Sequence, residues 1–309
     1  DTLKLGKGTF GSVYRAKINH PSGNKVVALK MLSKSKLRNS TRQECVNLKR
    51  EKDIQTRLSH PNILRMVSWT EDLNYFYLVL DLASGGDVFK MLRKSNNGLP
   101  EAVAARYLLG AVRAVAYLHQ NHIMHRDIKA RLALEHSRGR VKLADFGCAV
   151  HAMPPHYHER LTMCGTPEYA APEMLVFSPR YTNSVDVWSL GVLGYELLAG
   201  KTPFKTPREA SSGTGSTGSL SPCDGQETTV AAEIEAVHEG DDHAKLYGRI
   251  VGWNGSQDAL FGAGTLGGGV AAEARDVVMA MLRPLARDRA SCGEVLQLPW
   301  LASAGGGEV

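Results

Sequence analysis

Two aspartates, Asp127 and Asp145, stand 18 residues apart in short signatures whose residue types suit phosphoryl transfer. Asp127 lies in the run His-Arg-Asp-Ile-Lys, and Asp145 opens the run Asp-Phe-Gly. In the phosphoryl-transfer template, the first aspartate accepts the proton of the attacking hydroxyl, and the second holds Mg²⁺ against the nucleotide. The template places an asparagine for a second Mg²⁺ five residues after the first aspartate. Here that residue is Leu132, whose alkyl side chain cannot bind a hard cation.

A glycine-rich run near the N-terminus could fold over nucleotide phosphates. Gly6, Gly8, Gly11 and Val13 fit the spacing G-x-G-x-x-G-x-V, and the run lies between two predicted strands. The glycines would let backbone N–H groups approach phosphates, and Val13 would pack on the base. Taken alone, the run is equally compatible with an ordinary glycine-rich hairpin.

A lysine and a glutamate further along could position the phosphates. Lys30 follows Ala28 and Leu29 in a predicted strand, 17 residues after Val13, where the α- and β-phosphates need a cation. Its expected partner is Glu51 on the next predicted helix. A random Lys–Glu pair is usually a solvated surface pair, but these two residues stand in the order that the template requires.

The segments that carry these residues divide into a sheet-rich part and a helix-rich part. Alternating apolar residues and turn signals predict strands within residues 1–32 and 69–82, with a helix over 40–58 between them. Helical periodicity then predominates, over residues 88–92, 102–120, 271–282 and 293–296. We therefore expect an α+β fold with a small antiparallel β-sheet lobe, which carries one regulatory helix, and a larger, mainly helical lobe.

The expected domain covers residues 1–301, with an N-terminal lobe of residues 1–82 and a C-terminal lobe of residues 83–301. A Ser/Gly-rich stretch at about residues 207–243 is predicted to be a disordered insertion, because its composition cannot bury enough apolar surface to order it. Residues 302–309 are predicted to form a flexible tail.

Composition argues against several other classes of function. The net charge of +6 is spread along the 309 residues, whereas a nucleic-acid binder has clustered cations. Five cysteines without a C-x-x-C pair argue against a zinc site or a disulfide framework. The longest apolar run, Leu108–Leu118, contains Arg113 and is shorter than the ~18 residues of a membrane span. His151, His156 and His158 lack ligand-spaced partners and are interpreted as loop histidines.

Together with Ala-Pro-Glu at residues 171–173, the ordered motifs resemble the signature set of eukaryotic-type protein kinases. The chain is most similar to the Aurora group of Ser/Thr kinases, above all in residues 49–65, 145–152 and 162–166. The resemblance covers nearly the whole chain outside the 207–243 stretch. It implies a two-lobed kinase fold and ATP with Mg²⁺ as cofactors.

The same resemblance implies roles for residues of the N-terminal lobe. Leu80 would be the gatekeeper, and the segment from Asp81 to Ala83 would form the hinge that binds adenine. Gln55 matches the polar residue that Aurora kinases carry where most kinases keep an apolar spine residue.

In the C-terminal lobe, the resemblance assigns two kinds of role. Lys129 with Thr166 indicates specificity for serine and threonine. Asp186 would anchor the catalytic loop and Glu173 would pair with Arg289, both for stability more than for chemistry.

Thr162 occupies the position of the activating phosphate in Aurora-like kinases. Its phosphate would order the segment by pairing with Arg50, Arg126 and Arg160. The alternative is a plain loop threonine.

The chain departs from the family where Lys-Pro-Glu-Asn becomes Lys129-Ala130-Arg131-Leu132. The 13-residue interval from Leu132 to Asp145 matches the family, so the asparagine is substituted and not displaced. Arg131 replaces an acidic residue, which argues against assuming a preference for basic residues upstream of the target hydroxyl. Two hypotheses follow. The first is an ATP-dependent protein Ser/Thr kinase, and the second is a pseudokinase scaffold that keeps the fold; an error in the deduced sequence is a third explanation of Leu132.

The resemblance also implies partners and a cellular setting. We expect protein substrates with serine or threonine and an activating protein partner, without direct contact to nucleic acid or membrane. An intracellular location in nucleus or cytoplasm, at the spindle or centrosome, and a role in the cell cycle belong to the family, and no residue here demonstrates them.

Overall fold

The computed structural model describes residues 3–7, 11–20, 23–38, 42–95, 97–135, 139–152, 165–176, 181–205, 242–262 and 269–305. Contacts divide the chain into two compact units. Unit 1 comprises Asp1–Val88 and Arg131–Val150, and unit 2 comprises Phe89–Ala130 and His151–Val309. We describe each unit by itself.

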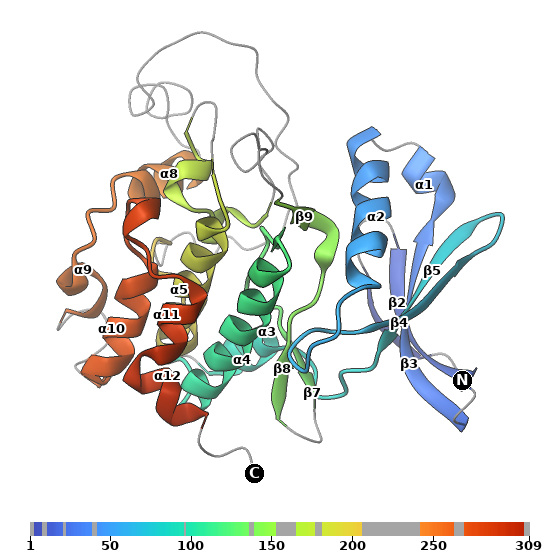
Figure 1. The fold of residues 1–309 in the computed structure, drawn as a ribbon, viewed down its shortest axis with the longest axis horizontal. Helices are drawn as coiled ribbons and strands as arrows, with labels where there is room; N and C mark the ends of the chain where they lie inside the picture. The colour runs from blue at the N-terminus through green and yellow to red at the C-terminus, as the bar shows by residue number, and fades with distance from the viewer. Residues whose placement is uncertain are drawn as a thin grey trace, which may run out of the picture. The chain divides into compact units, whose positions relative to one another are not determined.

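Unit 1 is built on a five-stranded antiparallel sheet with the strand order β1-β2-β3-β5-β4 (Figure 1). The strands are β1 (Leu3–Lys7), β2 (Gly11–His20), β3 (Gly23–Ser33), β4 (Met66–Glu71) and β5 (Tyr75–Asp81). Aromatic and β-branched residues favour strands, and β5 reads Tyr-Phe-Tyr-Leu-Val-Leu-Asp. The strands predicted within residues 1–32 and 69–82 are therefore confirmed.

The register of this sheet places the residues of the expected nucleotide set opposite one another. Val13 on β2 pairs with Lys30 on β3, and Ala28 on β3 pairs with Leu80 on β5. Because side chains alternate between the faces of a strand, this register fixes which side chains share a face. Ala28 and Leu80 both belong to a buried apolar cluster, and Val13 packs against it.

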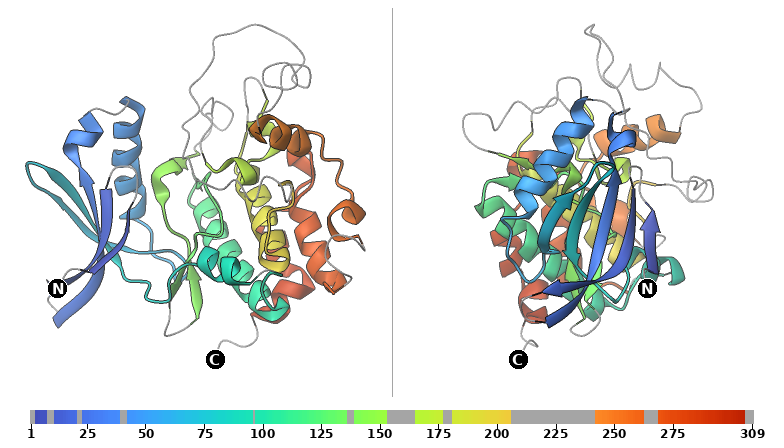
Figure 2. Two further views of the ribbon diagram at one scale, coloured as in Figure 1. Left: turned by 180° about the vertical axis from the view of Figure 1, so that it is seen from behind. Right: turned by 90° about the vertical axis from the view of Figure 1, so that its right-hand side faces the viewer.

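Two helices and a short hairpin complete unit 1. The helices are α1 (Lys34–Arg38) and α2 (Arg42–Gln55), and the right-hand view of Figure 2 shows α2 against the strands. The hairpin consists of β7 (Ala133–Glu135) and β8 (Arg140–Lys142), and the 3-10 turn η1 (Phe146–Cys148) follows it. The helix predicted over residues 40–58 ends earlier in the structure, because α2 stops at Gln55 and residues 56–57 form a turn before His60-Pro61.

Unit 2 is mainly helical, as predicted (Figure 1). Its helices are α3 (Val88–Lys94), α4 (Glu101–Gln120), α5 (Ser184–Ala199), α8 (Asp242–Val251), α9 (Gln257–Phe261), α10 (Ala272–Met281), α11 (Cys292–Gln297) and α12 (Pro299–Ala304). The short elements are β6 (Ile123–Met124), β9 (Val150–His151), η3 (Pro167–Tyr169), η4 (Pro172–Met174) and η5 (Ala286–Asp288).

Two glycines on α5 allow neighbouring helices to approach closely. A Cβ at Gly194 would lie 3.1 Å from the Leu108 side chain of α4, and one at Gly191 would lie 2.8 Å from the Leu282 side chain beside α10. Helix α5 ends at Ala199, and the following Gly200 has a φ of 74°, the left-handed conformation that glycine adopts without strain. Helix α5 is thereby held at the centre of the unit 2 core.

In unit 2, some boundaries predicted from the sequence differ from those in the structure. Helix α12 runs to Ala304, so the tail predicted from residue 302 begins too early, because the apolar Trp300 and Leu301 anchor that helix in the core. Most of the predicted insertion lies outside the described residues, and α8 already begins at Asp242. Among the described residues, no helix is long and apolar enough to cross a bilayer.

Candidate active site

Lys30, Glu51 and Asp145 meet in unit 1, although they come from three separate parts of the sequence. Lys30 Nζ donates a hydrogen bond to Glu51 Oε1 at 2.7 Å and lies 3.9 Å from Asp145 Oδ1. Burial alone would lower the pKa of Lys30, but the carboxylates of Glu51 and Asp145 outweigh it and raise that pKa above its usual value. Lys30 therefore carries a fixed positive charge that can face phosphate oxygens.

Asp145 has an unusual backbone conformation. Its φ of 66° lies in the left-handed region, which is uncommon for residues other than glycine. The next residue, Phe146, is fully buried, while the Asp145 side chain remains 63% exposed. A buried neighbour thus holds an exposed carboxylate in a strained turn, an arrangement that is frequent at functional sites. The sequence motif did not reveal this conformation.

The residues expected to contact the adenine base come together in one apolar region of unit 1. Ala28 and Leu80 are buried, and Val13 and Ala83 pack against the same cluster. Asp81, at the end of β5, donates its backbone N–H to the Arg65 carbonyl at 3.0 Å, and its carboxylate pairs with Lys25 at 2.6 Å. The Asp81 side chain is thus engaged within the chain.

The glycines of the run expected to bind phosphates differ in what surrounds them. A Cβ at Gly11 would lie 1.7 Å from the Met31 carbonyl oxygen, so only glycine fits there. Gly6 has open space around it. Gly8 lies outside the described residues.

Unit 2 brings Asp127, Lys129 and Thr166 into a closed triangle of hydrogen bonds. Lys129 Nζ donates to Asp127 Oδ2 at 2.6 Å and to Thr166 Oγ1 at 2.9 Å. Thr166 Oγ1 donates to Asp127 Oδ1 at 2.9 Å. Both oxygens of Asp127 accept charge-assisted or hydroxyl hydrogen bonds, and its side chain is only 11% exposed. The carboxylate is therefore oriented by its own chain.

Asp186 holds the backbone that precedes Asp127. It accepts hydrogen bonds from the backbone N–H groups of His125 and Arg126, at 2.9 and 2.7 Å. Although burial would raise the pKa of this fully buried carboxyl, hydrogen bonding and the charge of His119 hold it below the usual value. The expected anchoring role of Asp186 is thus confirmed by its contacts, while the His119 contact at 2.9 Å was not foreseen.

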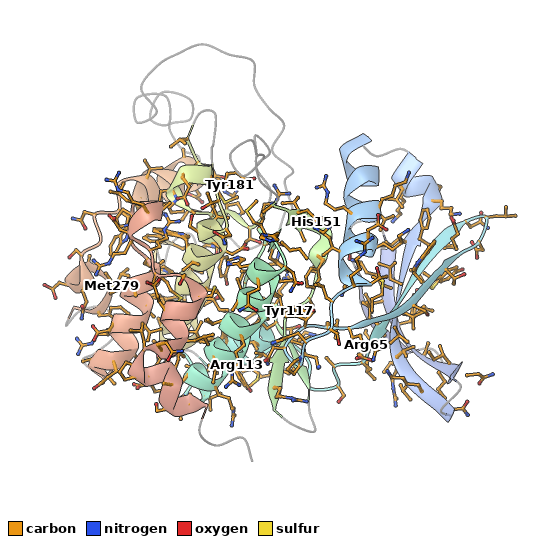
Figure 3. All side chains as sticks on the ribbon, viewed as in Figure 1. Arg65, Arg113, Tyr117, His151, Tyr181 and Met279 are labelled. Atoms are coloured by element: carbon orange, nitrogen blue, oxygen red, sulfur yellow. The ribbon has the colours of Figure 1, made fainter. Side chains whose placement is uncertain are left out.

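The segment around Asp127 also depends on two residues with left-handed backbone conformation. Arg126 has a φ of 67°, and its guanidinium donates to the Tyr181 hydroxyl at 2.9 Å (Tyr181 is labelled in Figure 3). Gly165 has a φ of 107°, and a Cβ there would lie 2.5 Å from the Arg126 carbonyl oxygen. Only glycine can therefore precede Thr166 in this arrangement.

A buried acid supports the same loop from α5. The Tyr169 hydroxyl donates to Glu196 and accepts from the backbone N–H of Ala130 at 3.3 Å. Burial raises the pKa of Glu196 to about 7, against a smaller opposing effect of the Tyr169 hydrogen bond. The Tyr169–Glu196 pair carries no sequence motif and was missed.

The expected ion pair between Glu173 and Arg289 is present. Glu173 accepts two hydrogen bonds from Arg289, of 2.5 and 2.7 Å, as the resemblance implied.

The two remaining predictions for unit 1 concern buried residues. Gln55 is 2% exposed and donates from its side-chain amide to the Leu64 carbonyl at 2.9 Å, which satisfies a polar group in the core. Leu132 is 1% exposed, so its side chain is part of the apolar interior.

Four residues named in the sequence analysis lie outside the described residues. They are the predicted phosphosite Thr162 and the neighbouring Arg160, His156 and His158.

Comparisons with known proteins agree with these arrangements. The family model of the protein kinase domain matches residues 1–301. The chain is similar to Serine/threonine-protein kinase Aurora-1 of Arabidopsis thaliana, with 36% identity over 96% of this chain and 84% of that protein. It is also similar to the Aurora kinase of Schizosaccharomyces pombe (43% identity; 65% of this chain, 54% of that protein) and to Aurora kinase B of Drosophila melanogaster (42%; 65% and 59%).

Proposed function

The chain belongs to the protein kinase family, among its Aurora-like serine/threonine kinases, and we propose that it transfers the γ-phosphoryl group of ATP to serine and threonine residues of proteins. The observation that carries this proposal is the assembled Lys30–Glu51 ion pair beside Asp145. In protein kinases, this ion pair and the Asp of Asp-Phe-Gly must both be in place for transfer.

The residues of unit 1 fit a nucleotide with a divalent cation. The Lys30 ammonium would hold phosphate oxygens, Glu51 keeps that ammonium in position, and the exposed Asp145 carboxylate is a hard oxygen ligand suited to Mg²⁺. Val13, Ala28, Leu80 and Ala83 would enclose the base with apolar surface. When bound, Mg-ATP supplies the phosphoryl group, and its cation neutralises charge that develops on the phosphate oxygens.

The residues of unit 2 would prepare the acceptor. Asp127 would accept a hydrogen bond from the substrate hydroxyl and take its proton as that oxygen attacks phosphorus. Lys129 donates a charge-assisted hydrogen bond to Asp127, so the carboxylate is oriented before the substrate arrives. Thr166 forms hydrogen bonds with both residues and thereby restrains the Asp127 carboxylate from rotating.

The alternative, a pseudokinase that serves as a scaffold, rests on Leu132 alone. The comparisons do not favour it, because the family match and the similar proteins are those of kinases. Lys30, Glu51, Asp127 and Asp145 are all present and form the contacts described above. Positioning and electrostatic stabilisation supply most of the catalysis in this reaction, so we expect these four residues to support transfer, at a reduced rate.

Family membership also supports proposals on regulation and setting. Thr162 would be the activating phosphosite, and an activating protein partner would act together with it. The cellular role would lie in chromosome segregation, with a location in nucleus or cytoplasm, at the spindle or centrosome. These proposals rest on similarity to Aurora kinases.

The deciding experiment is transfer of radiolabelled γ-phosphate from Mg-ATP to a generic basic protein, compared between the native chain and Lys30→Met. We expect transfer by the native chain and a loss of at least about 100-fold in the variant, since a preorganised charge that faces the phosphates is removed. Lys34→Met is a matched control, because Lys34 forms a comparable ion pair with Glu71 at 2.5 Å in the same unit.

The control should keep the native rate. No transfer from a folded native chain, or equal rates in Lys30→Met and the native chain, would contradict the proposed function. Asp145→Asn provides a second check, because it removes the carboxylate that would hold the cation while the nearby Lys30–Glu51 pair stays intact.

A further inference from the structure

We propose that this kinase works with a single divalent cation, held on the protein side by Asp145, because Leu132 leaves the second cation site of the family template without its asparagine ligand. The inference rests on the proposed function and specifies its cofactor requirement. It concerns residues of unit 1 only, which the structure describes together.

The segment around residue 132 offers no oxygen ligand from its side chains. From Arg131 to Leu134 the sequence reads Arg-Leu-Ala-Leu, in which no side chain contains oxygen. The Leu132 side chain is 1% exposed and so belongs to the apolar interior. Mg²⁺ requires oxygen ligands and is dehydrated reluctantly, so an aliphatic interior repels it. The family's second site therefore does not fit this chain.

Main-chain hydrogen bonds fix the register of this segment, so that no shift can bring another ligand into place. Val88 donates its backbone N–H to the Leu132 carbonyl at 3.1 Å, and Leu134 donates to the Gly86 carbonyl at 2.9 Å. On its other edge β7 pairs with β8, with Ala133 opposite Lys142. A strand held on both edges can slip only by breaking several hydrogen bonds at once. Leu132 is therefore a substitution at a preserved position.

Asp145 differs from Leu132 in each respect that matters for a cation. Its carboxylate is 63% exposed, and the left-handed turn holds it beside a fully buried Phe146. Within the described ranges, no group of three or more His, Cys, Asp or Glu side chains could hold a metal ion by itself. Mg²⁺ in kinases is usually bound through one or two protein ligands together with substrate phosphates. One carboxylate with the nucleotide is consistent with one cation.

The test counts bound cations by equilibrium dialysis of the full chain with Mn²⁺ and a non-hydrolysable ATP analogue. At saturating analogue, we expect about one Mn²⁺ per bound nucleotide for the native chain and about two for Leu132→Asn. Leu132→Ala is the matched control, because it shortens the same side chain without adding an oxygen, and it should keep the ratio of the native chain. Asp145→Asn should weaken Mn²⁺-dependent binding of the analogue about tenfold or more.

A ratio of about two in the native chain would overturn the inference, and so would analogue binding that is indifferent to Asp145→Asn. The ratio of bound Mn²⁺ to bound nucleotide in the native chain is decisive by itself, so the test remains valid even if the Leu132→Asn chain does not fold. The transfer assay separates this outcome from the proposed function. Transfer by a chain that binds two cations would refute the single-cation inference and leave the kinase assignment standing.

Discussion

The two aspartates of the catalytic signatures are held in opposite ways. In unit 2, Asp127 is 11% exposed, and both of its oxygens accept hydrogen bonds, from Lys129 and Thr166. In unit 1, Asp145 is 63% exposed, and the nearby Lys30 ammonium lies 3.9 Å away. The first carboxylate is oriented by its own chain, whereas the second faces solvent.

This difference matches the tasks proposed for the two residues. A proton acceptor must be aligned before the substrate hydroxyl arrives, because misplacement by a fraction of an ångström weakens proton transfer. A cation ligand needs exposed oxygens, because the cation and its nucleotide arrive from solvent. We therefore expect substitutions around Asp127 to lower the rate, with a loss of stability where a buried anchor is removed, and substitutions on the surface of unit 1 to affect neither strongly.

The largest effect is expected from Asp186→Ala. This change leaves two backbone N–H groups and His119 without their buried acceptor, and we expect a loss of about 3–5 kcal/mol in the free energy of unfolding, together with loss of transfer. Urea unfolding measures the first and the transfer assay the second. Asp288→Ala, at a side chain that is 56% exposed, should stay within about 0.5 kcal/mol of the native chain. Equal stability of both variants would show that Asp186 does not hold the loop.

The next largest effect concerns pH and Glu196. Its pKa is about 7 in the folded chain and 4.5 for an ordinary glutamate, so the folded state binds the additional proton between these values. The free energy of unfolding should therefore fall as pH rises from 4.5 to 7, by up to about 3 kcal/mol from this group. Glu196→Gln should remove this part of the slope in urea titrations at several pH values. An unchanged slope would contradict the prediction.

A moderate effect is expected from Thr166→Val, which keeps the side-chain shape and removes the hydroxyl that joins Lys129 to Asp127. We expect kcat to fall about tenfold, corresponding to about 1.4 kcal/mol, with little change in thermal stability. Thr166→Ser keeps the hydroxyl and should retain most of the rate. If the serine variant is as slow as the valine variant, the hydroxyl is not what orients Asp127.

The smallest effect is expected on the surface of unit 1, directly after Glu51. The Lys52 ammonium lies 4.1 Å from the centre of the Trp69 ring, a cation–π contact at a partly exposed site. Lys52→Met should cost about 0.5–1 kcal/mol in the free energy of unfolding and leave the transfer rate unchanged. A large loss of rate would mean that α2 depends on this contact to present Glu51.

The sequence was sufficient for the residues whose position follows from local spacing. The strand pattern around Lys30 and the helical pattern around Glu51 predicted the elements that join these two residues. Asp127 and Asp145 were identified because their neighbours form short, ordered signatures. Residues identified in this way stand at a fixed spacing from neighbouring residues of the same motif, and a single sequence is enough to show such spacing.

The remaining parts of the site depend on contacts between distant segments. Tyr169 and Glu196 are 27 residues apart, and His119 and Asp186 are 67 apart, with no motif that links them. The left-handed φ of Asp145 and the burial of the adjacent Phe146 are likewise revealed only by the packed structure. Helix α1 was missed because five residues are too few to show a helical period.

The hydrogen bonds that hold β7 come from the main chain, so they do not depend on which side chain stands at residue 132. Exchange of leucine for asparagine there would therefore remove none of these main-chain hydrogen bonds, although it would place a polar amide in an apolar interior. In a lineage of such proteins, a single codon change can remove or restore a ligand while the architecture stays constant. Catalytic capacity can consequently drift faster than the fold that carries it.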